Sequence, residues 1–468
     1  MYKTAIALAA GAISLAGATL PATAQAQSAN PPESPRPLPQ GPSRWAADYR
    51  FLKDPARRTE PLDAVRFHDL GPSAWLVLGG DMRYTHRTIT NPDFALGPFK
   101  DDSFMMQRLQ LHADLHLFDD AVRAFLQMQN TSTWGAKLPT PRDGNGTDVA
   151  QAFVDVNFTL GDTRSTVRVG RQEILFGQGA LFNIGDLRNV RLAFDGVRGT
   201  VKARDGKRLD LVALQPIVYE DGAMNNRADE DTQIYGAYGT LPLSTGTALD
   251  VYAFTRHIES RLFQGVAGEE DRHTVGVRYF GNTEKYKWTW DVMAQAGEHA
   301  DRDISAWGIR SLTQYKLDTP FKAALGVHFD VGSGGKPTGS TSRTFDGLYP
   351  KNGEYGIAGV TTQSNIILTG PSFILSPTPT TYVHMEVLKS WRQSTDDFVY
   401  LPGLRPVAGT RGNDERAIGT AYLVGGRWTP SQNIAIDLDL QHYAVDDAIK
   451  QAGGKDVRSA EFRISASF

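Results

Sequence analysis

Polar and apolar residues alternate along most of this chain with a period of two, which is the pattern of β-strands exposed to different surroundings on their two faces. In residues 107–117, for example, Arg108 and Gln110 alternate with Leu109 and Leu111. The pattern predicts about eighteen strands, each near the 9 to 11 residues that a tilted strand needs to cross a bilayer. They cover approximately residues 74–88, 107–117, 122–128, 150–160, 164–172, 193–204, 208–218, 231–241, 247–257, 272–282, 286–296, 304–317, 321–331, 364–374, 380–392, 416–428, 434–440 and 457–468.

The connections between these segments differ in length in a regular way. Every second junction is a short turn, such as Asp119-Asp120, Gly161-Asp162 and Asp205-Gly206. Most of the others are long, among them residues 131–149 and 173–192. Short turns at one rim and long loops at the other are typical of outer-membrane β-barrels, whose short turns are periplasmic.

Residues 166–202 allow two orientations of the alternating faces. Val167 and Val169 flank Arg168. Further along, Val197 and Val201 share one face of the strand and Arg198 lies on the other. A soluble sandwich would bury the valines in its core, whereas a membrane barrel would turn them to lipid and the arginine into an aqueous lumen. The segregation of loop lengths favours the barrel. The fold class predicted is therefore all-β, a transmembrane antiparallel β-barrel.

The two ends of the chain support export to an outer membrane. Lys3, the apolar residues 5–20 and small residues near position 24 form a secretory signal, predicted to span residues 1–26. Residues 27–70 are a Pro-rich leader followed by a short ordered periplasmic segment outside the barrel wall, and residues 71–468 are the barrel. The last strand ends on Phe468, and aromatic-terminated amphipathic strands resemble the insertion signal of bacterial outer-membrane barrels.

Composition narrows the chemistry. The 468 residues contain no cysteine, which excludes disulfides and thiolate sites, and the formal net charge of -3 does not suggest a nucleic-acid partner. The mean hydropathy of -0.33 is compatible with a barrel, because lumen and loops offset the lipid face. No Gly-x-Ser-x-Gly or His-Glu-x-x-His motif occurs. We therefore expect neither an enzyme nor a bound cofactor.

The phase of the alternation predicts which charges line the lumen. Arginine facing lipid near the bilayer midplane costs about 2 to 4 kcal/mol, so the arginines of the strands are expected to point inward. About seventeen Lys and Arg and about eleven carboxylates would then face the lumen, making it net positive and attractive to anions. The alternative is that these charges only form salt bridges that stiffen the wall. On phase alone we place these at the pore: Arg83, Arg108, Arg123, Asp155, Arg278, Arg310, Arg427 and Arg463.

Two motifs resemble a known family. Gly170-Arg-Gln-Glu-Ile-Leu-Phe-Gly-Gln178, followed by Asp186-Leu-Arg-Asn-Val-Arg191 and Phe194-Asp-Gly-Val-Arg198, is similar to the signature of the alginate export outer-membrane proteins. Residues 45–62 resemble the N-terminal segment of that family. One departure is Leu187, which stands where the family usually has an aromatic residue, so a stacking contact to sugar is in doubt.

The resemblance implies an eighteen-stranded, anion-selective barrel that passes a polyanionic, alginate-like polyuronate out of the periplasm. The partners implied are outer-membrane lipid, the polysaccharide and periplasmic export proteins, and the barrel is expected to be monomeric. By motif position, the residues assigned to the constriction or its loops are Arg168, Arg171, Glu173, Arg188, Arg191, Asp195 and Arg198.

Two other interpretations remain open at this point. The same architecture would serve a general or small-solute porin. Calcium on the outer loops is a weaker hypothesis, from Glu269-Glu270-Asp271 or from Asp301 and Asp303, because oxygen-rich clusters suit a hard cation but loop acids are usually only solvated.

Overall fold

The computed structural model describes residues 43–351 and 355–468. The predicted signal sequence and almost all of the Pro-rich leader lie outside these residues. Within the described part of the chain, no helix combines the length and the apolar composition needed to span a membrane.

The wall consists of eighteen long strands, as the alternation predicts. The first nine are β2 (Ala74–Thr90), β3 (Asp102–Leu117), β4 (Val122–Trp134), β5 (Gly146–Leu160), β6 (Thr163–Gln172), β7 (Phe194–Lys202), β8 (Arg208–Val218), β10 (Thr232–Ser244) and β11 (Thr247–Phe263). The second nine are β12 (Val266–Asn282), β13 (Tyr286–His299), β14 (Arg302–Lys316), β15 (Ala324–Gly332), β17 (Ile366–Thr378), β18 (Thr381–Trp391), β21 (Ala417–Ser431), β22 (Ile434–Val445) and β23 (Val457–Ser467).

Short elements lie between or before these strands. They are η2 (Arg44–Ala46), η3 (Arg50–Lys53), η4 (Pro55–Arg57), α2 (Asp63–Arg66), β1 (Phe67–Gly71), η5 (Pro92–Ala95), η6 (Gly177–Gly179), β9 (Arg227–Ala228), β16 (Thr341–Ser342), β19 (Tyr400–Leu401), β20 (Arg405–Pro406) and α3 (Asp447–Lys450).

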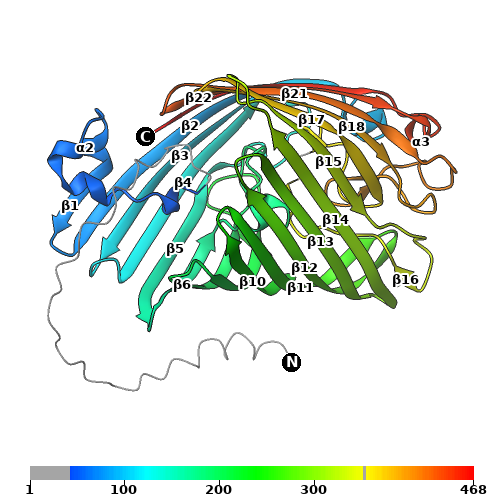
Figure 1. Ribbon diagram of the computed structural model, residues 1–468. Coiled ribbons are helices and arrows are strands. Elements are labelled where there is room, and N and C mark those ends of the chain that lie inside the picture. Colours follow the sequence, from blue (N-terminus) through cyan, green and yellow to red (C-terminus); the bar gives the residue numbers. More distant parts are fainter. Residues whose placement is uncertain (1–42, 352–354) are drawn as a thin grey trace. The chain divides into compact units, whose positions relative to one another are not determined.

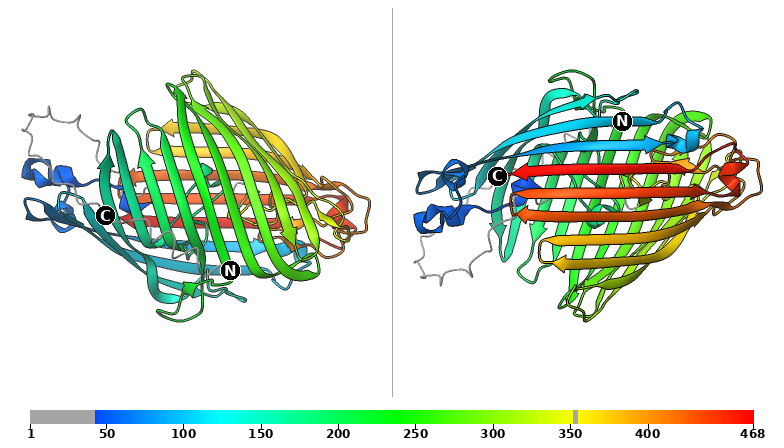
Figure 2. Two further views of the ribbon diagram at one scale, coloured as in Figure 1. Left: turned by 90° about the horizontal axis from the view of Figure 1, so that it is seen from below. Right: turned by 90° about the horizontal axis from the view of Figure 1, so that it is seen from above.

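Each wall strand pairs antiparallel with its neighbours in the chain, so the strands run side by side as a continuous tilted array (Figures 1 and 2). The array closes where β2 pairs with β23, in a register that runs from Asp81 opposite Ser467 to Thr90 opposite Arg458. Closure leaves no unpaired edge in the wall, which is the requirement for strands to cross a bilayer.

The two faces of the wall have the polarity expected for a membrane barrel. On β3, Leu111 is 52% exposed whereas Arg108 is 0% exposed. The same contrast separates Val277 from Arg278 on β12. Apolar side chains therefore face outward to lipid and charged side chains face the lumen, where they contact one another. The predicted orientation is confirmed.

The segment before the wall contacts the wall at two places. Tyr49 and Leu52 pack with Phe67, Trp75 and Val77 in a small apolar cluster at the start of β2. The residues just upstream, however, reach wet-face side chains of the wall: the Trp45 carbonyl accepts a hydrogen bond from Arg123 Nη2 at 2.5 Å. Residues 44–46 thus contact lumen-facing side chains of the wall without belonging to a wall strand, and the assignment of the whole segment to the periplasm stays a prediction.

Two long connections fold back into the lumen instead of extending away from it. We call residues 173–193 inner loop 1, and residues 343–351 with 355–360 inner loop 2. The two pair through backbone hydrogen bonds from Tyr349 N to the Leu181 carbonyl, 3.0 Å, and from Lys351 N to the Gly179 carbonyl, 2.8 Å. Together they narrow the passage through the barrel.

Candidate functional site

Three guanidinium groups converge on a single carboxylate of inner loop 1. Asp186 Oδ2 accepts a hydrogen bond from Arg83 Nη2 of β2 at 2.7 Å. Its Oδ1 accepts from Arg108 Nη2 of β3 at 3.0 Å and from Arg191 Nε of the same loop at 2.6 Å. We call these four residues the Asp186 cluster. The Asp186 side chain is 36% exposed, so the cluster borders open space.

The wider surroundings of the cluster carry an excess of positive charge. Asp81 lies 3.9 Å from Arg108 and also pairs with Arg44, at 3.3 Å. Glu173 lies 3.5 Å from Arg191. Four guanidinium groups (Arg44 and those of the Asp186 cluster) thus face three carboxylates, and two when Glu173 is protonated.

The loop carboxylates are perturbed in opposite directions. Burial alone would raise the pKa of Asp186, but Arg191, Arg83 and Arg108 together hold it well below its usual range. Burial raises the pKa of Glu173, and the nearby Arg191 only partly opposes this shift. Asp186 therefore loses its proton more readily than an exposed aspartate does, whereas Glu173 holds its proton more readily than an exposed glutamate does.

The start of inner loop 1 explains the glycines of the family-like motif. Gly170 of β6 lies directly opposite Gly196 of β7. A Cβ on Gly170 would meet the Ala152 carbonyl oxygen at 2.3 Å, and one on Gly196 would meet the Ala213 carbonyl oxygen at 2.1 Å. Both have positive φ, 127° and 151°. Glycine is required here because backbones approach closely where the loop leaves the wall.

Backbone contacts then fix the loop across the lumen. Arg87 Nη2 donates to the Leu187 carbonyl at 3.0 Å, and Asn189 Nδ2 donates to the Gln107 carbonyl at 2.7 Å. At the other side, Arg310 Nη1 of β14 donates to the Ala180 carbonyl at 3.1 Å. The loop is thus held by both walls, which positions Asp186 against β2 and β3.

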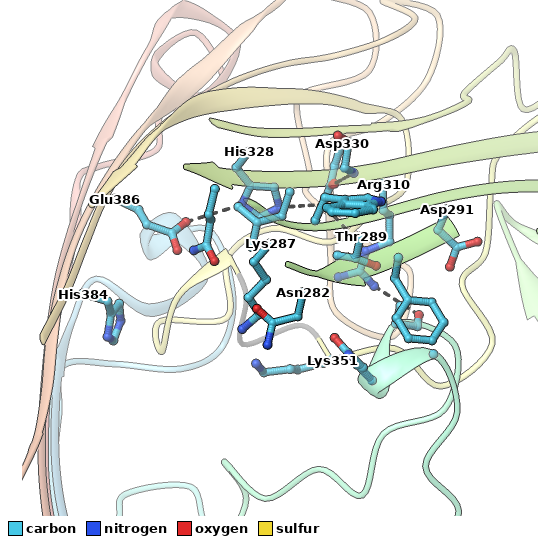
Figure 3. A pocket seen from close by; sticks show the side chains of 18 of the residues that line it. Asn282, Lys287, Thr289, Asp291, Arg310, His328, Asp330, Lys351, His384 and Glu386 are labelled. Atoms are coloured by element: carbon cyan, nitrogen blue, oxygen red, sulfur yellow. Dashed lines mark hydrogen bonds and ion pairs between the residues drawn. The ribbon is translucent and has the colours of Figure 1, made fainter. Parts of the chain in front are cut away.

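A cavity of about 900 Å³ lies on the short-turn side of the inner loops. We call it the vestibule. Figure 3 places His384 and Glu386 at one side and Asp291 at the other, with Lys287, Asn282 and Lys351 between them. Four carboxylates, three Lys or Arg side chains and two histidines line it: Asp291, Asp330, Glu386, Asp439, Lys287, Arg310, Lys351, His328 and His384. The vestibule is therefore of mixed charge.

One polar network closes the inner end of the vestibule. Tyr355 of inner loop 2 donates its hydroxyl hydrogen to Asp330 at 2.7 Å. His328 Nε2 lies 3.2 Å from the same carboxylate, and His328 Nδ1 lies 3.4 Å from Glu386. Arg310 Nε is 3.8 Å from Asp330. These contacts tie inner loop 2 to β14, β15 and β18.

A third cluster occupies the opposite wall. Arg123 donates through Nε and Nη2 to Asp114, at 2.7 and 2.6 Å, and Arg168 donates in the same way to Asp155, at 2.7 and 2.8 Å. The Trp45 ring lies over Arg168, with 3.9 Å from the guanidinium carbon to the ring centroid. Arg123, Asp155 and Arg168 are thus brought together, but away from the Asp186 cluster.

The remaining predicted residues form separate pairs around the wall. Arg188 is half exposed and lies 3.5 Å from Asp143. Arg427 also has a half-exposed side chain. The pairs are Arg171–Asp195 at 2.9 Å, Arg198–Asp210 at 2.9 Å, Arg278–Asp250 at 2.5 Å, Arg427–Asp437 at 2.6 Å, and Arg463–Glu461. Salt bridges therefore neutralise most of the predicted arginines, and among the residues predicted for the pore the positive excess is greatest near Asp186.

Several residues of these clusters, among them Asp186 and Trp45, were not among those predicted for the site. Asp186 opens the Asp-Leu-Arg-Asn motif, so its position was visible, but the sequence gives no sign that three arginines would share it. Trp45 lies in a segment assigned to the outside of the wall. Among the calcium candidates, Glu269 and Asp271 lie beside His257 with ligand atoms within 4.8 Å of one another, whereas Glu270 pairs with Arg256, Arg261 and Arg272. Calcium stays a prediction.

The model of the alginate export family matches residues 74–462, which is nearly the whole wall with both inner loops. The chain belongs to the alginate export family. As a member of this family it is an outer-membrane channel and not an enzyme, and lipid surrounds its wall. The resemblance seen in residues 170–198 is thereby confirmed, whereas the matched range does not include residues 45–62.

Solved structures with the same architecture come from other channels. The chain is similar to OccK11 (OpdR) of Pseudomonas aeruginosa, with 11% identity, a TM-score of 0.52 and coverage of 84% of this chain and 96% of that one. It is also similar to OccAB1 of Acinetobacter baumannii, with 12% identity, a TM-score of 0.56 and coverage of 84% and 96%. At this identity the likeness concerns the fold alone. No curated protein matches the sequence significantly.

Within this alginate export family member, the family motif and the Asp186 cluster coincide. Gly170 and Gly196 mark the two ends of inner loop 1, and the loop places Asp186 and Arg191 against Arg83 and Arg108. The motif therefore encodes a loop that carries charged groups into the lumen.

Proposed function

We propose that this channel passes an anionic polysaccharide, a polyuronate such as alginate, and that the Asp186 cluster selects for its carboxylates. The observation that carries the proposal is the convergence of Arg83, Arg108 and Arg191 on one carboxylate. A site that holds the carboxylate of Asp186 has the geometry to hold the same group on a sugar acid, because guanidinium forks match carboxylates. The family model supports a polysaccharide as the cargo.

The energetics suit transport better than tight binding. One pair of unit charges at 4 Å attracts by about 1 kcal/mol in bulk water and about 4 kcal/mol at the effective dielectric near a protein surface. Asp186 competes with an arriving carboxylate for the same donors, which keeps the net attraction small. A channel needs this balance, since its substrate must also leave.

The test is the ion selectivity of the purified channel in planar bilayers. Reversal potentials in a salt gradient give the ratio of anion to cation permeability, and added polyuronate gives the extent of current block. The triple variant Arg83→Gln, Arg108→Gln, Arg191→Gln should bring the permeability ratio close to one and weaken the block at least tenfold.

A matched control removes the same number of charges elsewhere in the lumen. The variant Arg171→Gln, Arg278→Gln, Arg427→Gln breaks three salt bridges that lie outside the Asp186 cluster. It should retain most of the selectivity and the block. Equal losses in both triple variants, with both barrels folded by heat-modifiable gel migration, would contradict the assignment of the Asp186 cluster.

A channel for small anionic solutes is the second candidate. The vestibule favours it, because about 900 Å³ suits a mono- or disaccharide and the inner loops meet at its inner end. Liposome swelling separates the two: a small-solute channel would admit monomeric uronates rapidly, and its current would be insensitive to submillimolar polyuronate.

A further inference from the structure

Three ring-bearing side chains stack along the lumen face of β3, β4 and β5, on the wall opposite the vestibule. His112 lies 5.6 Å from Phe125 between ring centroids, and Phe125 lies 5.0 Å from Phe153 with an angle of 17° between the rings. Phe125 and Phe153 are almost completely covered. Aromatic rings on the water-filled side of a barrel are exposed to solvent unless another part of the chain covers them. The low exposure of Phe125 and Phe153 therefore shows that other groups of the protein pack against them.

Oriented polar groups surround this row, and their charges balance. Arg123 and Arg168 each form a two-fold salt bridge, with Asp114 and Asp155. The Arg168 guanidinium carbon lies 3.6 Å from the Phe153 ring centroid. Within the described residues, Arg168 Nη1 is buried without a hydrogen-bond partner. Two positive and two negative charges leave a neutral surface that offers flat rings and unused N–H donors.

Trp45 covers the Phe153 end of this surface. Its ring meets the Phe153 ring edge to face at 6.3 Å and lies over the Arg168 guanidinium, and its carbonyl accepts from Arg123. The indole thus supplies a flat ring and the backbone supplies an oxygen acceptor. The indole N–H is buried and has no partner among the residues described. Trp45 therefore fills the surface without satisfying all of its polar groups.

We propose that Phe125, Phe153, Arg123 and Arg168 form a sugar-binding platform for one pyranose ring of the transported polysaccharide, and that Arg44–Ala46 is a displaceable cap over it. The proposal rests on the proposed function for the polymer. The C–H face of a pyranose packs on aromatic rings, and its hydroxyl oxygens accept hydrogen bonds from guanidinium groups. Because the platform is neutral, it recognises the sugar ring, whereas the Asp186 cluster recognises the carboxylate.

The cap is weakly held compared with the segment that follows it. None of the three residues of η2 is buried, and Ala46 is exposed. Apart from the contacts of Trp45, the side-chain contact that fixes the cap within the described residues is that of Arg44 Nε with Asp81, 3.3 Å. Downstream, Leu52 and Phe67 are buried in the apolar cluster at the start of β2. The cap can therefore leave the platform while the rest of the segment stays anchored.

The experiment measures single-channel block by a tri-uronate added from the short-turn side. Trp45→Ala should increase the affinity for the tri-uronate about tenfold, because the competing indole is removed. Adding Phe153→Leu, which keeps an apolar side chain but removes the flat ring, should abolish that gain. Trp290→Ala is the matched control, since this tryptophan is 46% exposed on the outward face.

A second ligand tests whether the platform recognises the sugar ring or only the charge. Oligoglutamate of equal charge has no sugar ring, so its block should not depend on Phe153. An unchanged tri-uronate block in Trp45→Ala, or a gain shared equally by oligoglutamate, would overturn the platform.

A neutral trisaccharide separates this proposal from the proposed function. If the wild-type channel lacks anion selectivity but Trp45→Ala gains a trisaccharide block that Phe153→Leu removes, the platform stands and the polyanion assignment falls. If selectivity is present and neither sugar responds to Trp45→Ala, the platform falls alone.

Discussion

Asp186 gives the lumen a built-in anion at the point where a polyanion is proposed to bind. Its carboxylate is held by three guanidinium groups, and its pKa lies well below the usual range because Arg191, Arg83 and Arg108 outweigh the effect of burial. It therefore stays ionised at lower pH than an exposed aspartate does. A resident carboxylate both positions the arginines and limits how strongly they hold a passing one.

Replacing this carboxylate should sharpen selectivity. In Asp186→Asn, one negative charge is lost while the three guanidinium groups remain, so we expect the anion to cation permeability ratio to rise several-fold, up to about tenfold for 1.4 kcal/mol. Reversal potentials measure the ratio. Asp195→Asn is the control, because Asp195 pairs with Arg171 outside the cluster. An unchanged ratio in Asp186→Asn would show that the current bypasses Asp186.

Glu173 should make selectivity depend on pH. Burial raises its pKa above the value of 4.5 usual for glutamate, so it binds a proton before exposed carboxylates do as the pH falls. Protonation removes a negative charge beside Arg191, and anion selectivity should increase on acidification through the raised pKa of Glu173. Glu173→Gln should show the acidic value already at pH 7 and a flatter titration of the reversal potential.

The same shift has a defined effect on stability. The pKa of Glu173 is higher in the folded state than in the unfolded state, so the folded state binds the proton more tightly. The contribution of Glu173 to the free energy of unfolding is therefore complete below the unfolded pKa and is lost as the pH rises through the folded pKa. Asp186 acts in the opposite sense: its contribution is complete above its unfolded pKa and is lost as the pH falls toward its lowered folded pKa.

A wild-type channel whose ion selectivity does not change with pH would contradict the role given to Glu173.

For single residues, the sequence predicts which face of the wall a side chain lies on but not which residue it contacts. Alternation placed Arg83 and Arg108 on the lumen face, because lipid penalises arginine. Nothing local indicated that Asp186, about a hundred residues along the chain from Arg83, would be their partner. The cap residue Trp45 was missed for the same reason: its contacts depend on a backbone path that periodicity does not describe.

The inner loops are the elements that turn a wide barrel into a narrow passage. Inner loop 1 is held by backbone hydrogen bonds to inner loop 2 and by an aromatic cluster in which Phe182 contacts the rings of Phe176, Phe194 and Tyr349. Phe182 is 0% exposed. The loop is therefore packed like a protein core although it lies inside a channel.

Removing one ring should loosen this packing. Large-to-small changes of buried aromatic residues typically cost about 3 to 5 kcal/mol. In Phe182→Ala we expect a larger mean conductance and more current noise, because inner loop 1 would no longer be fixed across the lumen. The thermal transition of the wall should change little. Phe158→Ala, at a position 41% exposed on the outward face, is the control and should leave conductance unaltered.

The sequence predicts those elements that follow a repeating pattern, which are the strands of the wall. The eighteen wall strands follow from alternation and from the segregation of turn lengths, since both are imposed by the bilayer. The alternation predicted residues 173–192 only as a long connection, although the family resemblance assigned Glu173, Arg188 and Arg191 to the constriction or its loops. Whether such a loop extends outward or folds inward depends on contacts such as Arg310 with the Ala180 carbonyl, which no local pattern reveals.

At the scale of the whole molecule, the lipid-facing surface sets the energetics of insertion. Leu111 of β3 is 52% exposed and lies near the middle of its strand, whereas Leu160 lies at the end of β5 beside a short turn. Leu111→Arg should destabilise the folded barrel by about 2 to 4 kcal/mol and Leu160→Arg by about 0 to 1 kcal/mol. Equilibrium unfolding from lipid vesicles in denaturant measures the difference. Equal costs at the two positions would contradict the placement of the membrane.

The junction of β2 with β23 has a consequence for biogenesis. It joins the two ends of the wall, and Arg87 of β2 forms a salt bridge there with Glu461 of β23. Arg83, a ligand of Asp186, belongs to this same first strand. A nascent barrel that has not yet received its final strand thus has a gap beside Arg83. If the Asp186 cluster selects for anions as proposed, an intermediate with this gap still open would conduct salt without discrimination.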